Sequence, residues 1–255
     1  MTGRVYLIGA GPGAPDLLTL RAADVLRRAD VVFHDSLVHP ETLALAVRAE
    51  KTAVGKRSGR RSTAQQFINK RLVDAASRHA VVVRLKGGDP MLFGRAQEEI
   101  DALRRAGIEF EIVPGVTAAT AAAAELGVSL TRRGLSRHVV FITPRTAEGE
   151  RGNDWAASVL AADTAVLYMG AGLAQSISAE LIRRGKPADT PVALVESVSL
   201  PERRVLFGAL ASLPELARRT GSGPTIVLFG EVLKAALAQR SPAPDEEIDE
   251  LLRRA

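Results

Sequence analysis

The chain has 255 residues, of which 46% are hydrophobic, so it can bury one large core or two smaller ones. It contains no cysteine, which excludes disulfides, thiolate metal sites and a cysteine nucleophile. No apolar run approaches the roughly 20 residues of a membrane span, and the N-terminus lacks the long apolar region of a secretory signal, so we expect a cytoplasmic protein with no membrane partner. The formal net charge of +5 suits an acidic ligand, either a nucleic acid or a small molecule.

Apolar stretches alternate with stretches of helical periodicity along most of the chain. The stretches expected as strands are 4–9, 31–35, 80–85, 110–115, 138–143, 164–170, 191–197, 203–209 and 225–231. The segments with apolar residues at i, i+3 and i+4, expected as helices, are 17–28, 63–78, 95–106, 116–126, 173–184 and 211–219. This alternation is typical of an α/β protein with mostly parallel strands. The short gap between 197 and 203 instead predicts one antiparallel hairpin.

A Pro-Gly pair at 114–115 interrupts an apolar run and predicts a domain boundary. We expect an N-terminal α/β domain over residues 1–114, which holds the glycine-rich loops, and a C-terminal α/β domain over residues 115–240. Residues 241–255 are highly charged and follow a proline-containing break, so we expect a tail that is either a short helix or disordered.

The loop after the first expected strand reads GAGPGAP, at residues 9–15. Gly9, Gly11 and Ala14 fit the G-x-G-x-x-G/A spacing of a dinucleotide-binding turn, and Asp35 lies where such a turn has its ribose-binding acid. The prolines of this loop oppose that interpretation, because they stiffen the turn and remove backbone donors that a pyrophosphate would need. The spacing alone therefore leaves a nicotinamide cofactor open but weakly supported.

A second glycine loop, in VVRLKGGDPMLFGR at residues 82–95, follows another apolar strand. Gly87 and Gly88 have no Cβ atom and allow a ligand to approach the backbone closely. Asp89 adds an acceptor, and the proline after it fixes the exit of the turn. Two such loops at the carboxyl ends of strands in one domain predict a ligand crevice there.

These motifs occur with others in a fixed order, and together they resemble the tetrapyrrole (class III) methyltransferases, which use S-adenosylmethionine. The blocks that carry the resemblance are GAGPGAPDLLTL, ADVVFHDSLV, VGKRSGRRS, VVRLKGGDPMLFGR, VPGVTAATAAAAELGVSLTRRGLS, LYMG, TPVALVES and RRVLFGAL, within residues 4–233. GKRSG and KGGDPMLFGR are typical of the members that methylate uroporphyrinogen III. The resemblance implies two α/β domains with mostly parallel, mixed sheets and a cleft between them.

The implied reaction is methylation of uroporphyrinogen III at C2 and then C7, which gives precorrin-2 for siroheme or cobalamin synthesis. S-adenosylmethionine would be the methyl donor and S-adenosylhomocysteine the product, and no metal would be needed. The resemblance also implies a homodimer. Because no dehydrogenase–ferrochelatase region precedes the matched blocks, we expect a stand-alone methyltransferase.

By the same resemblance, Asp35 is the proton acceptor and Lys56 the proton donor. Asp35 ends an apolar strand, where partial burial would make it more basic, although it could instead cap the next helix. Lys56 lies in a glycine loop and could instead be a solvated surface charge. The substrate carries several carboxylates, which arginine binds in bidentate fashion, and we expect Arg84 and Arg95 to contact them.

Nine residues are implied as cofactor ligands: Pro12, Gly87, Gly88, Asp89, Leu92, Thr117, Ala118, Met169 and Val198. Four blocks depart from the family pattern. The family commonly has TGH where residues 143–145 read TPR, LTHR where 130–133 read LTRR, YMGLN where 168–172 read YMGAG, and ENGT where 196–199 read ESVS. Val198 therefore replaces a glycine. These departures affect details of ligand contact rather than the expected methyl transfer.

Three other functions remain as alternatives. A sibling methylase could act on a later corrin precursor, on diphthamide or on ribosomal RNA, although GKRSG and GRRS argue against it. A nicotinamide oxidoreductase would use the first glycine loop. A basic nucleic-acid-binding module would account for the net charge, but no basic run with interleaved aromatic residues is present, so we expect no nucleic-acid partner.

Overall fold

The computed structural model describes residues 3–54, 62–146 and 154–238. Contacts divide the chain into two compact units. Unit 1 comprises Met1–Ala121 with Ser199–Pro201, and unit 2 comprises Ala122–Val198 with Glu202–Ala255. The boundary after residue 114 remains a prediction about separately folding domains. The charged tail and the loop that contains Lys56 lie outside the described residues.

Unit 1 is built on a five-stranded parallel sheet with the strand order β3-β2-β4-β1-β5. The strands are β1 (Arg4–Gly9), β2 (Val31–His34), β3 (Glu50–Ala53), β4 (Val81–Lys86) and β5 (Phe110–Val113). The central strands are nearly continuous runs of buried aliphatic residues, which is typical of parallel sheets covered on both faces. The α/β class with parallel strands is confirmed here.

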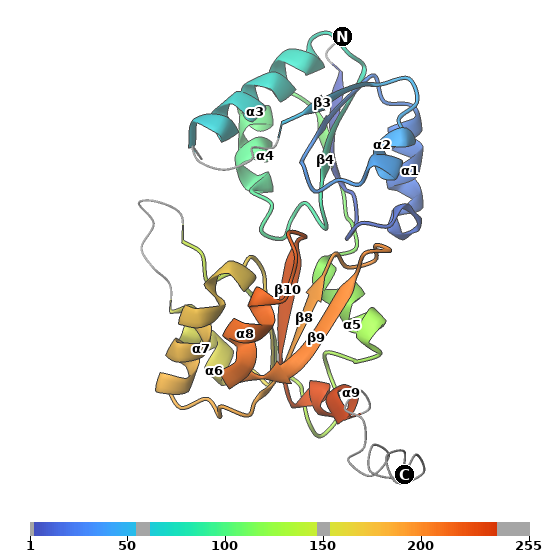
Figure 1. Cartoon of the computed structure of the whole chain (residues 1–255). Helices are drawn as coiled ribbons and strands as arrows, with labels where there is room; N and C mark the ends of the chain where they lie inside the picture. Colours follow the sequence, from blue (N-terminus) through green and yellow to red (C-terminus); the bar gives the residue numbers. More distant parts are fainter. Residues whose placement is uncertain (1–2, 55–61, 147–153, 239–255) are drawn as a thin grey trace, which may run out of the picture. The chain divides into compact units, whose positions relative to one another are not determined.

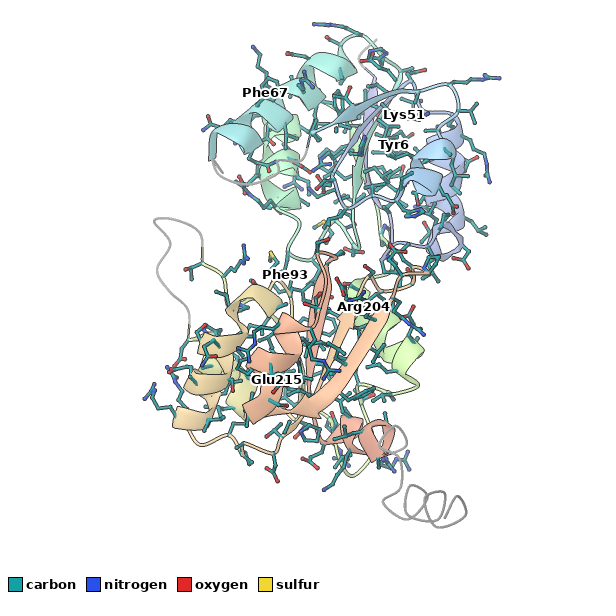
Figure 2. All side chains as sticks on the ribbon, viewed as in Figure 1. Tyr6, Lys51, Phe67, Phe93, Arg204 and Glu215 are labelled. Carbon is teal, nitrogen blue, oxygen red and sulfur yellow. The ribbon has the colours of Figure 1, made fainter. Side chains whose placement is uncertain are left out.

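Helices cover both faces of this sheet (Figure 1). On one face lie α1 (Leu20–Arg27) and α2 (Pro40–Ala44), and on the other lie α3 (Ser62–Ala76) and α4 (Ala96–Arg105). Side chains of β1 alternate between them: Leu7 packs with α3 and α4, whereas Tyr6 packs with α1. The guanidinium carbon of Arg28 lies 5.3 Å from the centre of the Tyr6 ring, which is labelled in Figure 2.

The chain leaves β1 and β4 in opposite directions. The crossover through α1 leads from β1 to β2, whereas the crossover through α4, on the other face, leads from β4 to β5. β1 and β4 are neighbours in the sheet, so their carboxyl ends diverge at a topological switch point. Ligands of open α/β sheets bind in the crevice at such a point.

Unit 2 has a mixed five-stranded sheet with the order β6-β7-β10-β8-β9, in which only β6 and β7 pair in parallel. The strands are β6 (Val139–Ile142), β7 (Thr164–Leu167), β8 (Pro191–Glu196), β9 (Arg204–Ala209) and β10 (Thr225–Gly230). The helices are α5 (Ala118–Leu126), which begins in unit 1, α6 (Trp155–Ala161), α7 (Ala174–Arg183), α8 (Leu213–Arg218) and α9 (Lys234–Ala238). Residues of α6, α7 and α8 share one core with the sheet. The predicted hairpin is confirmed as β8–β9.

Candidate functional site

Two glycine-containing loops join at the carboxyl edge of the unit 1 sheet. The amide of Gly88 donates to the carbonyl of Gly11 at 2.7 Å, and the amide of Gly11 donates back to Gly88 at 3.2 Å. The loop after β5 joins them through Gly115, since a Cβ atom on Gly9 would lie 2.6 Å from both the Cα of Gly115 and the carbonyl oxygen of Gly88. The loops after β1, β4 and β5 therefore form one continuous backbone surface at the switch point. We call this meeting of Gly9, Gly11, Gly88 and Gly115 the glycine joint.

Gly88 is the position where this surface opens. Its φ is +67°, a conformation that side chains rarely adopt, and a Cβ atom built there would meet nothing within 4 Å. The space in front of the Gly88 backbone is thus available to a ligand. Gly87 and Pro12, which flank the same joint, are both partly buried.

Asp89 braces the joint. Its Oδ2 accepts a hydrogen bond from the amide of Gly115 at 2.9 Å, and its Oδ1 accepts one from the amide of Met91 at 2.7 Å. Leu92 closes the turn by donating its amide to the Asp89 carbonyl at 3.3 Å. Asp89 thus links its own loop to the loop after β5. Direct contact of Asp89 or Leu92 with a cofactor remains a prediction.

Thr117 and Ala118 lie at the start of α5, shortly after the Gly115 joint. The Thr117 carbonyl accepts from the amide of Ala121 at 3.2 Å and from the hydroxyl of Thr120 at 3.0 Å, as expected for the first helical turn. The amides of a first turn have no partner within their helix and point away from it. Of the nine expected cofactor residues, six lie in loops that meet at one sheet edge, and a seventh, Ala118, begins the helix that follows one of these loops.

Asp35 follows β2 and is paired with a buried arginine. Arg84 of β4 donates from Nη2 to Asp35 Oδ1, and the two side chains are 3% and 28% exposed. Among the described residues, Asp35 Oδ2 has no hydrogen-bond partner. The guanidinium of Arg84 therefore lies directly against this partly exposed carboxylate.

The expected substrate arginines differ in exposure. Arg84 uses all three guanidinium nitrogens on protein acceptors, with Nε 3.0 Å from Glu99 Oε1 and Nη1 3.0 Å from the Leu85 carbonyl. Its burial counts against direct contact with a substrate, so that role remains a prediction. Arg95 caps α4 with a φ of +55°, and its exposed side chain pairs with Glu98 at 2.6 Å.

Glu99 is a buried acid that the sequence analysis missed. It is 0% exposed and accepts from Arg84, from Lys86 Nζ at 3.0 Å and from Gln65 Nε2 at 3.2 Å. Burial lowers the pKa of Lys86, and so does the nearby Arg84 cation. Burial also acts to lower the pKa of Arg84, but the carboxylates of Glu99 and Asp35 raise it overall. Helical periodicity in the sequence could have revealed Glu99, because it falls on the buried face of α4 with Ala96, Ile100 and Leu103.

Met169 lies in unit 2 beside a cavity of about 440 Å³. It is 46% exposed with a φ of +57°, and its carbonyl accepts from Arg145 Nε at 3.3 Å. The cavity is lined by Arg145, Met169, Ala171, Gly172, Ala217, Thr220, Gly221, Ser222, Gly223 and Thr225. Most of these, including the turn at 221–223, were not predicted. Buried Glu196 holds that turn by accepting from the amides of Gly221 and Gly223 at 2.9 and 2.8 Å.

Val198 is 4% exposed and ends the first segment of unit 2. It lies between Ser197 and Ser199, whose φ angles are +51° and +67°. Ser199 belongs to unit 1, where its hydroxyl accepts from the amide of Ala14 at 2.9 Å. Val198 stands where the family pattern has a glycine. The left-handed backbone of this bend lies at the two serines on either side of it. Lys56, the expected proton donor, lies outside the described residues.

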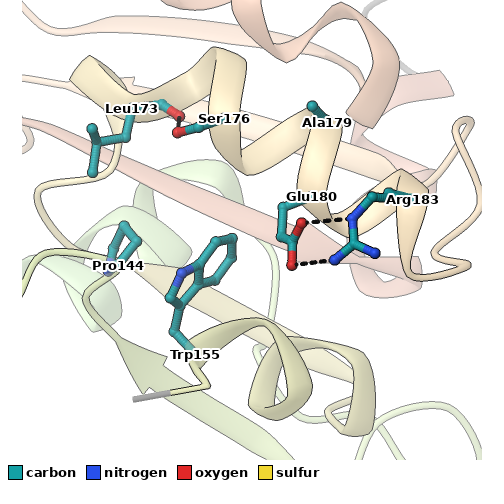
Figure 3. Close-up of a pocket in the computed structure, with 7 residues that line it drawn as sticks. All are labelled: Pro144, Trp155, Leu173, Ser176, Ala179, Glu180 and Arg183. Atoms are coloured by element: carbon teal, nitrogen blue, oxygen red, sulfur yellow. Dashed lines mark hydrogen bonds and ion pairs between the residues drawn. The ribbon is translucent and has the colours of Figure 1, made fainter. Parts of the chain in front are cut away.

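A second cavity, of about 470 Å³, is shown in Figure 3. It is lined by Pro144, Trp155, Leu173, Ser176, Ala179, Glu180 and Arg183. Its polar wall is an ion pair in which Arg183 Nη2 lies 2.8 Å from Glu180 Oε1. None of the residues expected in the site lies in this cavity, and we do not assign a ligand to it.

The family model of the Tetrapyrrole (Corrin/Porphyrin) Methylases matches residues 4–214. The chain belongs to this family. Among curated relatives of this tetrapyrrole methylase, siroheme synthase of Zymomonas mobilis is 45% identical over 248 residues, which are 96% of this chain and 52% of the relative. Siroheme synthase of Pseudomonas entomophila is 47% identical over 234 residues, 91% of this chain and 50% of the relative. The chain spans about half the length of these relatives.

Solved structures agree with this assignment. The uroporphyrin III C-methyl transferase of Thermus thermophilus is 39% identical, with a TM-score of 0.79, over 91% of this chain and 94% of that one. The same values hold for its complex with S-adenyl homocysteine. A cobalt precorrin-4 methyltransferase is 29% identical, with a TM-score of 0.75, over 90% of this chain and 95% of that one. The tetrapyrrole methylase fold expected from the sequence is confirmed.

Within residues 3–54, 62–146 and 154–238, no helix is both long and apolar enough to cross a membrane. In the same part of the chain, no three His, Asp or Glu side chains are grouped so that they could hold a metal ion.

Proposed function

We propose that this chain methylates uroporphyrinogen III at C2 and then C7 with S-adenosylmethionine, giving precorrin-2 and two molecules of S-adenosylhomocysteine. The observation that carries the proposal is the three-loop glycine joint at the switch point of unit 1. The similarity to the Thermus thermophilus uroporphyrin III C-methyl transferase, over 94% of that chain, supports the choice of substrate.

The residues of the joint fit the methyl donor. The open space at Gly88 gives a ligand access to backbone that no side chain covers. The residues that would hold the donor here are Pro12, Gly87, Gly88, Asp89, Leu92, Thr117 and Ala118. The resemblance also assigns Met169 and Val198 to the methyl donor. When bound, S-adenosylmethionine supplies a methyl group activated by a sulfonium.

In this proposal Asp35 is the general base. Each methylation of a ring carbon adds a methyl cation equivalent and is completed by loss of one proton from the macrocycle. Arg84 holds one oxygen of Asp35, and Oδ2, which has no partner among the described residues, can accept that proton. The resemblance makes Lys56 a proton donor; any proton that it gives to the macrocycle would be matched by a further proton lost from it, so that each methylation still removes one proton net. Arg95 would bind a substrate carboxylate.

The experiment is an anaerobic incubation with S-adenosylmethionine and freshly reduced uroporphyrinogen III, analysed by mass spectrometry. Two added methyl groups, with two equivalents of S-adenosylhomocysteine, are expected. Calorimetric titration with S-adenosylhomocysteine runs in parallel. Binding without methyl transfer would reject this substrate and favour a sibling methylase that acts on a later corrin precursor. Absence of binding would reject the cofactor as well.

We further propose that the protein acts in the cytoplasm as a homodimer, as the resemblance implies. Light scattering coupled to size-exclusion chromatography measures its mass in solution. A monomer mass at micromolar concentration would contradict the dimer.

A further inference from the structure

Glu99 lies at the centre of a charge cluster in unit 1 that comprises Glu99, Arg84, Lys86 and Asp35. It is 0% exposed, and its carboxylate accepts from Arg84, Lys86 and Gln65. A buried carboxylate without partners would be strongly unfavourable, so these three donors stabilise the Glu99 side chain in the interior. Because no part of Glu99 reaches the surface of unit 1, it cannot itself contact a substrate.

Arg84 connects this interior to Asp35. Its Nε binds Glu99 at 3.0 Å, its Nη2 binds Asp35, and its Nη1 donates to the carbonyls of Leu85 and Phe33 at 3.0 and 3.4 Å. A guanidinium presents its donors in a rigid plane, so fixing Nε also fixes the direction of Nη2. The position of Asp35 thus depends on where Glu99 holds Arg84.

The charges of the cluster balance only when Asp35 is included. Arg84 and Lys86 are the cations, and Glu99 and Asp35 are the anions. Lys86 places Nζ 3.1 and 3.0 Å from the two oxygens of Glu99. Three of the four side chains are 4% exposed or less, whereas Asp35 is 28% exposed. The cluster therefore extends from the core to a single accessible carboxylate.

We propose that Glu99 is a positioning residue for the reaction, and that it orients Asp35 through Arg84. This inference rests on the proposed function, in which Asp35 accepts the proton. In this proposal Arg84 holds Asp35 in position and does not itself contact the substrate. A displacement of about 1 Å in a reacting group can lower a rate roughly a hundredfold, so a residue that acts only through Arg84 can strongly affect turnover.

The test uses Glu99→Gln, Asp35→Asn and the double variant, with Asp101→Asn as the matched control. Asp101 lies on the same helix, α4, and its side chain is 46% exposed. Active sites are counted by titration with S-adenosylhomocysteine, and kcat and KM for uroporphyrinogen III are measured anaerobically. We expect Glu99→Gln to lower kcat by about 10- to 100-fold with KM nearly unchanged, and Asp101→Asn to match the wild type.

The double variant separates positioning from a general loss of structure. If Glu99 acts through Asp35, adding Glu99→Gln to Asp35→Asn lowers kcat by no more than about threefold further. Effects that multiply in full, or a Glu99→Gln enzyme with wild-type kcat, would overturn the inference. A wild-type enzyme that does not methylate uroporphyrinogen III would instead refute the proposed function, before any variant is compared.

Arg84→Lys provides a second test should Glu99→Gln fold poorly. Lysine keeps the charge but lacks the planar donors that join two carboxylates. A positioning role predicts a lower kcat with KM nearly unchanged. A rise in KM at unchanged kcat would show that Arg84 binds the substrate, and would overturn the inference.

Discussion

Gly11 and Gly88 exchange two backbone hydrogen bonds, at 2.7 and 3.2 Å, and so join the loops that follow two neighbouring strands. The joint depends on backbone alone. It places Gly88, with a φ of +67° and open space at its Cβ position, at the point where a ligand would approach.

Gly88→Val should strongly weaken binding of S-adenosylhomocysteine. The branched side chain would fill the open space and would strain the left-handed backbone. Calorimetry should show affinity lowered by more than about tenfold, or about 1.4 kcal/mol. The matched control is Gly107→Val, because Gly107 has a φ of +66° and open space at Cβ but lies just beyond the end of α4. Equal affinities for the two variants would show that Gly88 does not border the ligand.

Asp35→Ala should bind S-adenosylhomocysteine normally and lose turnover by about 100-fold or more, since general base catalysis contributes roughly that much. Anaerobic turnover by mass spectrometry measures the loss. Asp24→Asn, an exposed change on α1, serves as the control. Turnover within twofold of the wild type would remove Asp35 from the mechanism.

Arg145→Ala should weaken S-adenosylhomocysteine binding by about three- to tenfold, because Arg145 supports the carbonyl of Met169 with one net hydrogen bond. Arg183→Ala changes an exposed arginine of the other unit 2 cavity and should leave affinity unchanged. The comparison identifies which cavity belongs to the cofactor. The reverse result would assign the Trp155 cavity to it.

Glu180→Gln should lower the melting temperature at pH 7 and not near pH 2. Hydrogen bonds from Arg183 and Arg184 lower the pKa of Glu180 from 4.5 to about 2. A carboxylate whose pKa is lower in the folded state stabilises the fold above its unfolded pKa, and this contribution disappears as pH falls through the folded pKa. The difference from the wild type should therefore shrink between pH 4.5 and 2.

Glu215→Gln is the control for this pH effect, since Glu215 is exposed on α8 and has no ion pair among the described residues (Figure 2). Added salt should reduce the effect of Glu180→Gln, because the two ion pairs are partly exposed to solvent. A difference that stays constant with pH would show that the ion pairs do not stabilise the fold.

The strands with continuous apolar runs were predictable from sequence, and every expected strand is present. β3 was not, because its four residues, EKTA, lie at the sheet edge and are mostly exposed. The short helices α2, α6 and α9 were missed because five to seven residues hold few turns in which to show periodicity. The six-residue α8 was predicted, since the 3-10 turn Leu210–Ser212 directly before it lengthens the helical pattern.

Parts of the site were predictable for a similar reason. The loops at Gly11 and Gly88 carry local signals, namely glycines directly after apolar strands. The pairing of Asp35 with Arg84 joins residues 49 positions apart and depends on the register of β2 on β4, which pairs Phe33 with Arg84. No local pattern encodes that register. Glu99 had a local signal, an acid on an apolar helix face, but its partners are fixed only by the fold.

The contact between Gly9 and Gly115 limits how this site can be altered. A single methyl group at Gly9 would collide with the backbone of two other loops, so not even alanine fits at this position. Any engineering of ligand preference in unit 1 must therefore work from the rim of these loops, where Arg95 carries a long, exposed side chain. A library that randomises the rim and leaves the glycines untouched would retain folded proteins, and one that includes the glycines would be depleted of them.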